Sequence, residues 1–309
     1  MAAPTSRTDR NTISRVTVVA DDGVPLAATV TGPPDADMTL VCLHGHCQDS
    51  ASWSPACDLV TVPGIRVIRY DQRGYGRSGT SDTVSSSVSA MADDLDAVLR
   101  TLAPDGPVVL AGYSMGGMVA LAYARRHSDA VGTRVVGAGL FATAASGLAE
   151  EGIGRCLRHP ATTIVHRAVS RAPRMMELSK RAGGRVCTVA ARRRPPESWL
   201  RLLGSALSHE TSIVTWSRLL SDVAVLDESA ALAVLSRVPA VVAAGTEDVF
   251  VPLSLSEAMA ARLPRATLVR FDGVGHRVLA DRPDEVARAL SGLLERVRAQ
   301  REETSAAAC

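Results

Sequence analysis

The stretch from Val108 to Leu121 reads Val-Val-Leu-Ala-Gly-Tyr-Ser-Met-Gly-Gly-Met-Val-Ala-Leu and predicts a strand, a sharp turn and a helix in immediate succession. The turn runs from Gly112 to Gly116 and has the pattern G-x-S-x-G, with Ser114 at its centre. Such a turn exposes the serine hydroxyl, and its backbone leaves no room for a Cβ atom two residues to either side. The amides that begin the following helix point at any oxyanion formed there. Ser114 is therefore predicted to be a nucleophile.

Short apolar runs alternate with longer helical segments on both sides of this turn, which is typical of a mostly parallel sheet covered by helices on both faces. The expected strands are Ser14–Val19, Leu26–Val30, Thr39–Leu43, Val67–Tyr70, Val108–Ala111, Val135–Leu140, Ala240–Ala244 and Thr267–Phe271. The first two flank an Asp-Asp-Gly turn and should form an antiparallel hairpin. The expected helices are Ser52–Val60, Ser87–Leu102, Met118–Arg126, Leu253–Leu263 and Pro283–Gln300. The predicted fold class is α/β, with a doubly wound sheet of eight strands.

One segment, from Ala145 to Leu226, interrupts this alternation. It has helical stretches but no clear strand, and its 13 Lys and Arg against six Asp and Glu give it a net charge of +7. A basic helical block inserted after the sixth strand is interpreted as a cap or lid, although it could also merely extend the scaffold. We therefore expect a core of residues 1–144 and 227–300, a cap of residues 145–226 and a flexible tail of residues 301–309.

The composition excludes several classes of protein. Of the 309 residues 46% are hydrophobic and 21% charged, as in an ordinary globular chain rather than a disordered one. A net charge of +2 and 3% aromatic residues argue against a nucleic-acid partner. The six cysteines show no C-x-x-C pair and no zinc-ligand spacing, so no metal site is expected. No cofactor is expected either. No run is long and apolar enough to span a membrane, and Met1–Ser14 lacks the apolar core of a secretory signal, which favours a cytoplasmic location.

A serine nucleophile needs a base that removes its proton and a carboxylate that orients the base. His276 is the candidate base, because it follows the last expected strand through a glycine-flanked loop and precedes the last helix. Asp248 is the candidate acid, in the loop after the strand Ala240–Ala244. Glu247 is adjacent and remains its rival.

Four stretches of the chain resemble motifs of the α/β-hydrolase fold superfamily, in the family's order. The first is the G-x-S-x-G turn. His44-Gly45 is similar to the oxyanion-hole motif, and Asp71–Ser78 to the D-x-R-G-x-G-x-S turn after the fourth strand. Gly245–Pro252 and Gly275-His276 are similar to the acid and histidine loops. The resemblance covers about residues 14–300, the cap being the poorly matched part, and points to the serine-nucleophile, esterase- and lipase-like branch.

The resemblance implies a triad of Ser114, Asp248 and His276. It favours Asp248 over Glu247, because the family places its acid three residues beyond the glycine that ends the strand. It also implies an oxyanion hole made of two backbone N–H groups, those of Met115 and His46.

Other polar and aromatic residues near these motifs have structural interpretations. His44 is expected to hold the oxyanion loop, and Cys47, which has no apparent base, to be a pocket or packing residue. Asp71 and Arg73 are expected to tie the turn that follows the fourth strand. Trp53 is expected to be buried against the oxyanion loop and is a substrate-binding candidate that would line the acyl pocket.

The implied reaction is acyl transfer from a small-molecule substrate, through an acyl-enzyme on Ser114. Family members that are epoxide hydrolases or haloalkane dehalogenases use an aspartate nucleophile, so Ser114 argues against both. One hypothesis is a serine hydrolase of carboxylic esters or thioesters. The alternative is a thioesterase, acyltransferase or cyclase of a biosynthetic pathway, acting on a carrier-bound or anionic acyl group. A binding protein without catalysis is disfavoured, because all three triad positions are intact.

Overall fold

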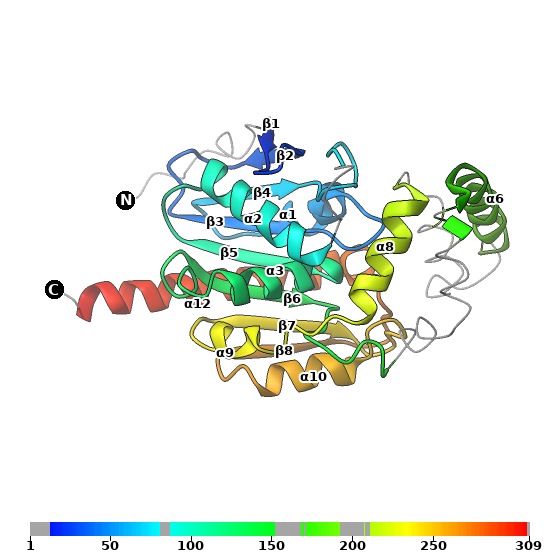
Figure 1. Cartoon of the computed structure of the whole chain (residues 1–309). Helices are drawn as coiled ribbons and strands as arrows, with labels where there is room; N and C mark the ends of the chain where they lie inside the picture. The colour runs from blue at the N-terminus through cyan, green and yellow to red at the C-terminus, as the bar shows by residue number, and fades with distance from the viewer. Residues whose placement is uncertain are drawn as a thin grey trace.

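The computed structural model describes residues 13–80, 87–151, 168–169, 171–191, 207 and 211–307. Its centre is one sheet of eight strands in the order β1-β2-β4-β3-β5-β6-β7-β8 (Figure 1). The strands are β1 Ser14–Val19, β2 Pro25–Thr31, β3 Met38–Leu43, β4 Ile65–Tyr70, β5 Val108–Tyr113, β6 Val135–Phe141, β7 Ala240–Gly245 and β8 Ala266–Phe271. The β1/β2 and β2/β4 pairs are antiparallel and the others parallel, so the predicted mostly parallel, eight-stranded sheet is confirmed.

Helices cover both faces of the sheet and enclose two apolar cores. One core contains buried residues of α2 (Val88–Leu102), α3 (Met115–Arg126), α9 (Ala231–Leu235) and α10 (Leu253–Ala261). The other contains residues of α1 (Ser54–Cys57), α11 (Val278–Asp281) and α12 (Pro283–Ala307). The central strands β3, β5, β6 and β7 are buried along their whole length, as expected for strands with helices on both sides.

Three helices differ from their predicted limits by three residues or more. The helix expected at Ser52–Val60 is a 3₁₀ turn, η1 (Ser50–Trp53), followed by the short α1. Asp49 caps η1 by accepting the Ala51 N–H, which starts the turn early. The helix expected from Met118 begins at Met115, directly after the sharp turn. The flexible tail expected at residues 301–309 is helical as far as Ala307, because Arg, Glu and Ala favour the helix even where they are exposed.

The described residues between β6 and β7 form helices and no strand. They include α6 (Pro173–Ala191) and α8 (Ile213–Ala224), which lie at the same end of the sheet (Figure 1). His46 follows the carboxyl end of β3, and its ring centroid lies 6.0 Å from that of Trp216 in α8. The helices therefore lie at the carboxyl end of β3. Much of the expected cap, including residues 152–167 and 192–206, lies outside the described residues, so the cap at 145–226 stays a prediction. Within the described part of the chain, no helix combines the length and apolar character needed to cross a bilayer.

Candidate active site

Ser114 occupies a strained turn between β5 and α3. Its backbone has φ 51° and ψ −121°, a conformation that non-glycine residues rarely adopt. The Ser114 N–H donates to the Phe141 carbonyl at 2.9 Å, and its carbonyl accepts from Thr143 Oγ1 at 2.8 Å. These bonds to β6 and to the residues after it hold the turn in place. The surrounding structure therefore keeps Ser114 in its strained backbone conformation.

The glycines of the turn are required by close backbone contacts. A Cβ atom on Gly116 would lie 2.2 Å from the Leu43 carbonyl oxygen, and one on Gly112 would lie 2.5 Å from the backbone of Gly117. Both distances are far below van der Waals contact. The packing of α3 against the end of β3 therefore explains Gly116, and the close approach of the end of β5 to the start of α3 explains Gly112.

His276 and Asp248, the candidate base and acid, lie beside Ser114. His276 Nε2 is 2.9 Å from Ser114 Oγ, and His276 Nδ1 is 2.7 Å from Asp248 Oδ2. Because a carboxylate only accepts hydrogen bonds, Nδ1 carries the proton and Nε2 is left to accept from the serine hydroxyl. The three side chains thus form one continuous hydrogen-bonded chain.

The carboxylate that contacts the imidazole is that of Asp248 and not that of its neighbour. Asp248 is buried, and its second oxygen, Oδ1, accepts the backbone N–H groups of Phe250 and Val251, both at 2.9 Å. Glu247 is exposed to solvent. Two backbone amides and an imidazole therefore hold Asp248 in one orientation, which the sequence alone did not reveal.

Tyr113 and Phe250 pack around the imidazole, and sequence reasoning missed both. The Tyr113 hydroxyl donates to the His276 carbonyl at 2.8 Å. The ring centroids of Tyr113 and Phe250 are 5.4 Å and 5.6 Å from that of His276. Burial raises the pKa of Tyr113, so its hydroxyl stays protonated and a donor. Tyr113 stands at a variable position of G-x-S-x-G, and no pattern in the sequence marked it.

The loop after β3 is held by the histidine of its motif. The backbone N–H of Gln72 donates to His44 Nε2 at 2.9 Å, so the proton of His44 is on Nδ1, which donates to the Gly45 carbonyl at 2.8 Å. The Gln72 side chain donates to the His44 carbonyl at 2.7 Å. His44 is fully buried among these partners. It positions the loop, in agreement with the structural interpretation.

The two predicted oxyanion amides stand at the start of α3 and in this loop. The N–H of Met115, the first residue of α3, donates to no acceptor among the described residues. His46 follows Gly45, and its Nδ1 lies 2.5 Å from the Tyr75 hydroxyl.

Burial raises the pKa of the neighbouring Cys47 thiol to about 12, which leaves it protonated and fits a packing role.

Trp53 is buried against the oxyanion loop, and its side chain is closed to solvent. Its indole N–H donates to the Leu43 carbonyl at 2.9 Å, and its ring packs edge-on against Phe141. Its exposed fraction is 0%, so no part of the indole is open to a substrate. This corrects its assignment as a substrate-binding residue. The hydrogen bond from the indole N–H to the Leu43 carbonyl holds the ring against the end of β3.

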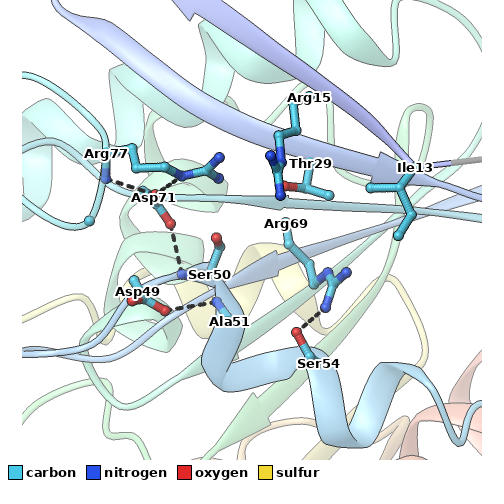
Figure 2. A pocket seen from close by; sticks show the side chains of 11 residues that line it. Ile13, Arg15, Thr29, Asp49, Ser50, Ala51, Ser54, Arg69, Asp71 and Arg77 are labelled. Carbon is cyan, nitrogen blue, oxygen red and sulfur yellow. Dashed lines mark hydrogen bonds and ion pairs between the residues drawn. The ribbon is translucent and has the colours of Figure 1, made fainter.

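Asp71 ties the turn after β4 to the start of η1. Its Oδ1 accepts the Ser50 N–H at 2.8 Å, and its Oδ2 accepts the Arg77 N–H at 2.9 Å (Figure 2). The Ser78 hydroxyl donates to the Asp71 carbonyl. The role is structural, as expected.

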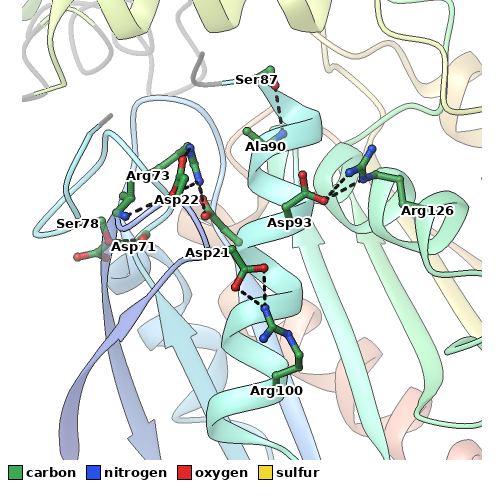
Figure 3. A network of polar contacts seen from close by, with 12 residues as sticks. Asp21, Asp22, Asp71, Arg73, Ser78, Ser87, Ala90, Asp93, Arg100 and Arg126 are labelled. Carbon is green, nitrogen blue, oxygen red and sulfur yellow. Dashed lines mark hydrogen bonds and ion pairs between the residues drawn. The ribbon is translucent and has the colours of Figure 1, made fainter. Parts of the chain in front are cut away.

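Arg73 does not bind Asp71 but joins the turn to two other elements. Its guanidinium pairs with Asp22, in the β1–β2 turn, at 2.8 Å, and with Asp94 of α2 at 2.6 Å (the network around it is drawn in Figure 3). The hydrogen bond from Arg73 holds the pKa of Asp22 below its usual value. Burial raises the pKa of Asp94, and Arg73 opposes that rise. Arg73 thus has the structural role expected of it, with Asp22 and Asp94 as its partners.

The part of the chain that the structure describes holds no group of three or more His, Cys, Asp or Glu side chains placed to bind a metal ion. The polar groups that converge on Ser114 are an imidazole, a carboxylate and backbone amides. This arrangement is suited to activating a hydroxyl and to stabilising an oxyanion.

This chain is similar to known proteins in both sequence and structure. The sequence model of the α/β hydrolase fold matches residues 39–283. EphD of Mycobacterium tuberculosis, named as a candidate oxidoreductase, is 36% identical over 110 residues, which are 35% of this chain but 18% of EphD. RutD of Caulobacter sp. (strain K31), named as a candidate carbamate hydrolase, is 26% identical over 86% of this chain and 94% of its own length.

A thermophilic esterase from Thermogutta terrifontis is similar in structure. Its TM-score is 0.69 at 25% sequence identity, over 92% of this chain and 99% of the esterase. The match to the family extends from β3 to the start of α12 and includes the serine turn, the acid loop and the histidine loop. The chain therefore belongs to the α/β hydrolase fold family.

Proposed function

We propose that the protein is a serine hydrolase that cleaves a carboxylic ester through an acyl-enzyme on Ser114. The observation that carries this proposal is the unbroken hydrogen-bonded chain from the Asp248 carboxylate through the His276 imidazole to the Ser114 hydroxyl. The order of these three residues along the chain is also that of the α/β hydrolase fold.

In the first half of the reaction, Ser114 Oγ attacks the ester carbonyl carbon while His276 Nε2 takes the hydroxyl proton. The carbonyl oxygen becomes an oxyanion, which the N–H groups of Met115 and His46 stabilise. When the intermediate collapses, the bond to the alcohol oxygen breaks and His276 returns the proton to the departing alcohol. The acyl group is then bonded to Ser114.

In the second half, water replaces the alcohol. His276 takes a proton from the water as its oxygen attacks the acyl carbon, and the acid leaves as Ser114 recovers its proton. Asp248 stabilises the imidazolium formed in each half. Because two backbone amides already hold its other oxygen, the carboxylate stays in line with Nδ1 throughout.

Helices after β6 form the roof over this site in our proposal. Trp216 of α8 faces His46, and Lys180 of α6 is buried and donates to the Thr211 carbonyl just before α8. A roof that excludes bulk water would strengthen the hydrogen bonds to the oxyanion. The region 145–226 is therefore proposed to act as a cap that also selects the acyl group.

The names of similar proteins support the same reaction class. The T. terrifontis protein is an esterase and RutD is named as a candidate carbamate hydrolase; both act, by name, on a carbonyl with a leaving group. A carboxylic ester is the substrate that we propose here. A thioester would pass through the same acyl-enzyme, and the experiment below separates the two.

The test measures turnover of p-nitrophenyl esters of increasing acyl length and of the corresponding acyl thioesters. We expect the wild-type protein to hydrolyse at least one ester, and Ser114→Ala to lose about 10³-fold or more in kcat. Ser236→Ala removes a partly exposed hydroxyl just before the amino end of β7, whereas Ser114 follows the carboxyl end of β5, and this variant serves as the control. Turnover of thioesters alone would move the proposal to a thioesterase. An unchanged rate in Ser114→Ala would contradict it altogether.

A further inference from the structure

Two arginines and a threonine form a row across the antiparallel edge of the sheet. Arg15 of β1 is the register partner of Thr29 of β2, and Thr29 is the register partner of Arg69 of β4. Register partners point to the same face of a sheet, and neighbouring strands lie about 4.8 Å apart. The two guanidinium groups therefore flank the threonine hydroxyl on one face.

The packing of neighbouring residues identifies that face. Ala28 and Val30, which alternate with Thr29, belong to the apolar core under α2 and α3. Val67, two residues before Arg69, belongs to the core under α1 and α12. The row thus lies on the α1 side, but near β1 no helix of the described chain covers it.

A cavity of about 550 Å³ occupies this uncovered place (Figure 2). The row forms one part of its wall, and Ser54 of α1 and the residues that begin η1 form another. A cavity of this volume is in the range that holds small organic molecules. None of Ser114, Asp248 and His276 lines it, so it is separate from the proposed hydrolytic site.

Arg69 is buried beside this cavity without an acidic partner. Its exposed fraction is 9%, and within the described chain its guanidinium donates a hydrogen bond to the Ser54 hydroxyl. Its Nε atom is buried and has no hydrogen-bond partner among the described residues. No Asp or Glu in that part of the chain forms an ion pair with Arg69 or with Arg15. A buried guanidinium without an anion is unfavourable, so a ligand that supplies one would be bound there.

The cavity also contains carboxylates, at its other end. Both oxygens of Asp71 already accept hydrogen bonds, from Ser50 and Arg77, and Arg77 Nε lies 3.4 Å from that carboxylate. Asp49 accepts from the Ala51 N–H at 2.9 Å. Figure 2 shows these acids on the side of η1, away from Arg15 and Thr29. The positive charges of Arg15 and Arg69, at the other end of the cavity, are therefore not neutralised by these acids.

We propose that this cavity binds a small organic anion, through a carboxylate or phosphoryl group held between Arg15 and Arg69. Guanidinium groups match both kinds of oxyanion by paired hydrogen bonds. The Thr29 hydroxyl supplies a further donor between them. The site is independent of Ser114 and does not require that the protein be a hydrolase.

Binding is tested with two probes, inorganic phosphate and succinate, each titrated calorimetrically into the full chain at constant ionic strength set with sodium chloride. We expect saturable binding of one probe or both to the wild-type protein. Arg69→Met and Arg15→Gln should each weaken it by about tenfold or more, the loss expected for a charge-assisted hydrogen bond. Arg15 is exposed, so its variant decides the test if Arg69→Met does not fold.

Two controls make the result specific. Arg66→Gln removes an arginine of the same strand that does not line the cavity, and it should change binding by less than about twofold. Ser114→Ala should bind both probes as the wild type does. The proposal is overturned if neither probe binds, if binding survives in both arginine variants, or if Ser114→Ala abolishes it.

Discussion

His276 Nε2 lies 2.9 Å from Ser114 Oγ although 162 positions separate the two residues in the chain. The contact exists because the turn after β5 and the loop after β8 both open at the carboxyl end of a parallel sheet. In open α/β sheets this edge is where ligands bind. The fold therefore brings the nucleophile and the base together without any local sequence signal that links them.

Substitution of the acid should distinguish Asp248 from its neighbour. Asp248→Asn removes the carboxylate that fixes the His276 tautomer, and we expect kcat to fall by about 10³- to 10⁴-fold. Glu247→Gln, the matched control on an exposed side chain, should change kcat by less than about twofold. Steady-state kinetics on a p-nitrophenyl ester provides the measurement. The reverse pattern would mean that Glu247 is the acid.

The triad should behave as one unit. If Ser114 and His276 act in the same step, the double variant Ser114→Ala/His276→Ala should be about as slow as either single variant. Independent contributions would instead multiply the two losses. Rates for the wild type, both single variants and the double variant decide between these outcomes.

The serine turn should not tolerate a methyl group. In Gly116→Ala the new Cβ would meet the Leu43 carbonyl, and neither backbone can move freely, so the free energy of unfolding should fall by about 2 kcal/mol or more. Gly292→Ala is the control, because that helical glycine has open space around its Cβ position, and alanine there should stabilise the protein by up to about 1 kcal/mol. Urea unfolding measures both. Equal stability of the two variants would contradict the close packing of α3 on β3.

The ion pair between Asp22 and Arg73 predicts a pH-dependent contribution to stability. Because the folded state lowers the pKa of Asp22, the pair stabilises the protein above the unfolded-state pKa of 3.8, and this contribution is lost as the pH falls through the folded-state pKa. The Asp22→Asn variant should be less stable than the wild type by about 1 kcal/mol at pH 7, since water still reaches this partly exposed side chain. The difference should shrink below about pH 4. A difference that stays constant down to pH 3 would show that the charge of Asp22 is not its source.

Most of the fold could be predicted from the sequence because its signals are local. The apolar runs of the central strands are bounded by turns, and the Ser87 cap of α2 and Pro283 at the start of α12 mark helix ends within a few residues. The end of α12 was placed too early. Residues 301–307 have the helix propensity of Arg, Glu and Ala but no apolar stripe, and propensity alone did not extend the predicted helix over them.

The site was predictable only where a motif carries the chemistry. Ser114, Asp248 and His276 stand in recognisable turns and loops, whereas Tyr113 and Phe250 act through packing that depends on the whole fold. Trp53 lies against the oxyanion loop as expected, but its indole is fully covered, and the sequence gives no indication of which side of that loop a large aromatic residue occupies.

The row of Arg15, Thr29 and Arg69 could not be predicted from the sequence either. It depends on the register of three strands and on the absence of a helix over β1 and β2 in the described chain. Neither is encoded in a single local pattern. Arginines at these positions are easily mistaken for ordinary solvated charges.

Labelling with a fluorophosphonate tests the central proposal most directly, because the reagent bonds covalently to a serine that a neighbouring base activates. After digestion, mass spectrometry should find one adduct, on the peptide that contains Ser114, and His276→Ala should label far more slowly. Ser114→Ala should not be labelled at all. An adduct on a different serine, or undiminished labelling of the Ser114→Ala variant, would contradict the assignment of Ser114 as the nucleophile.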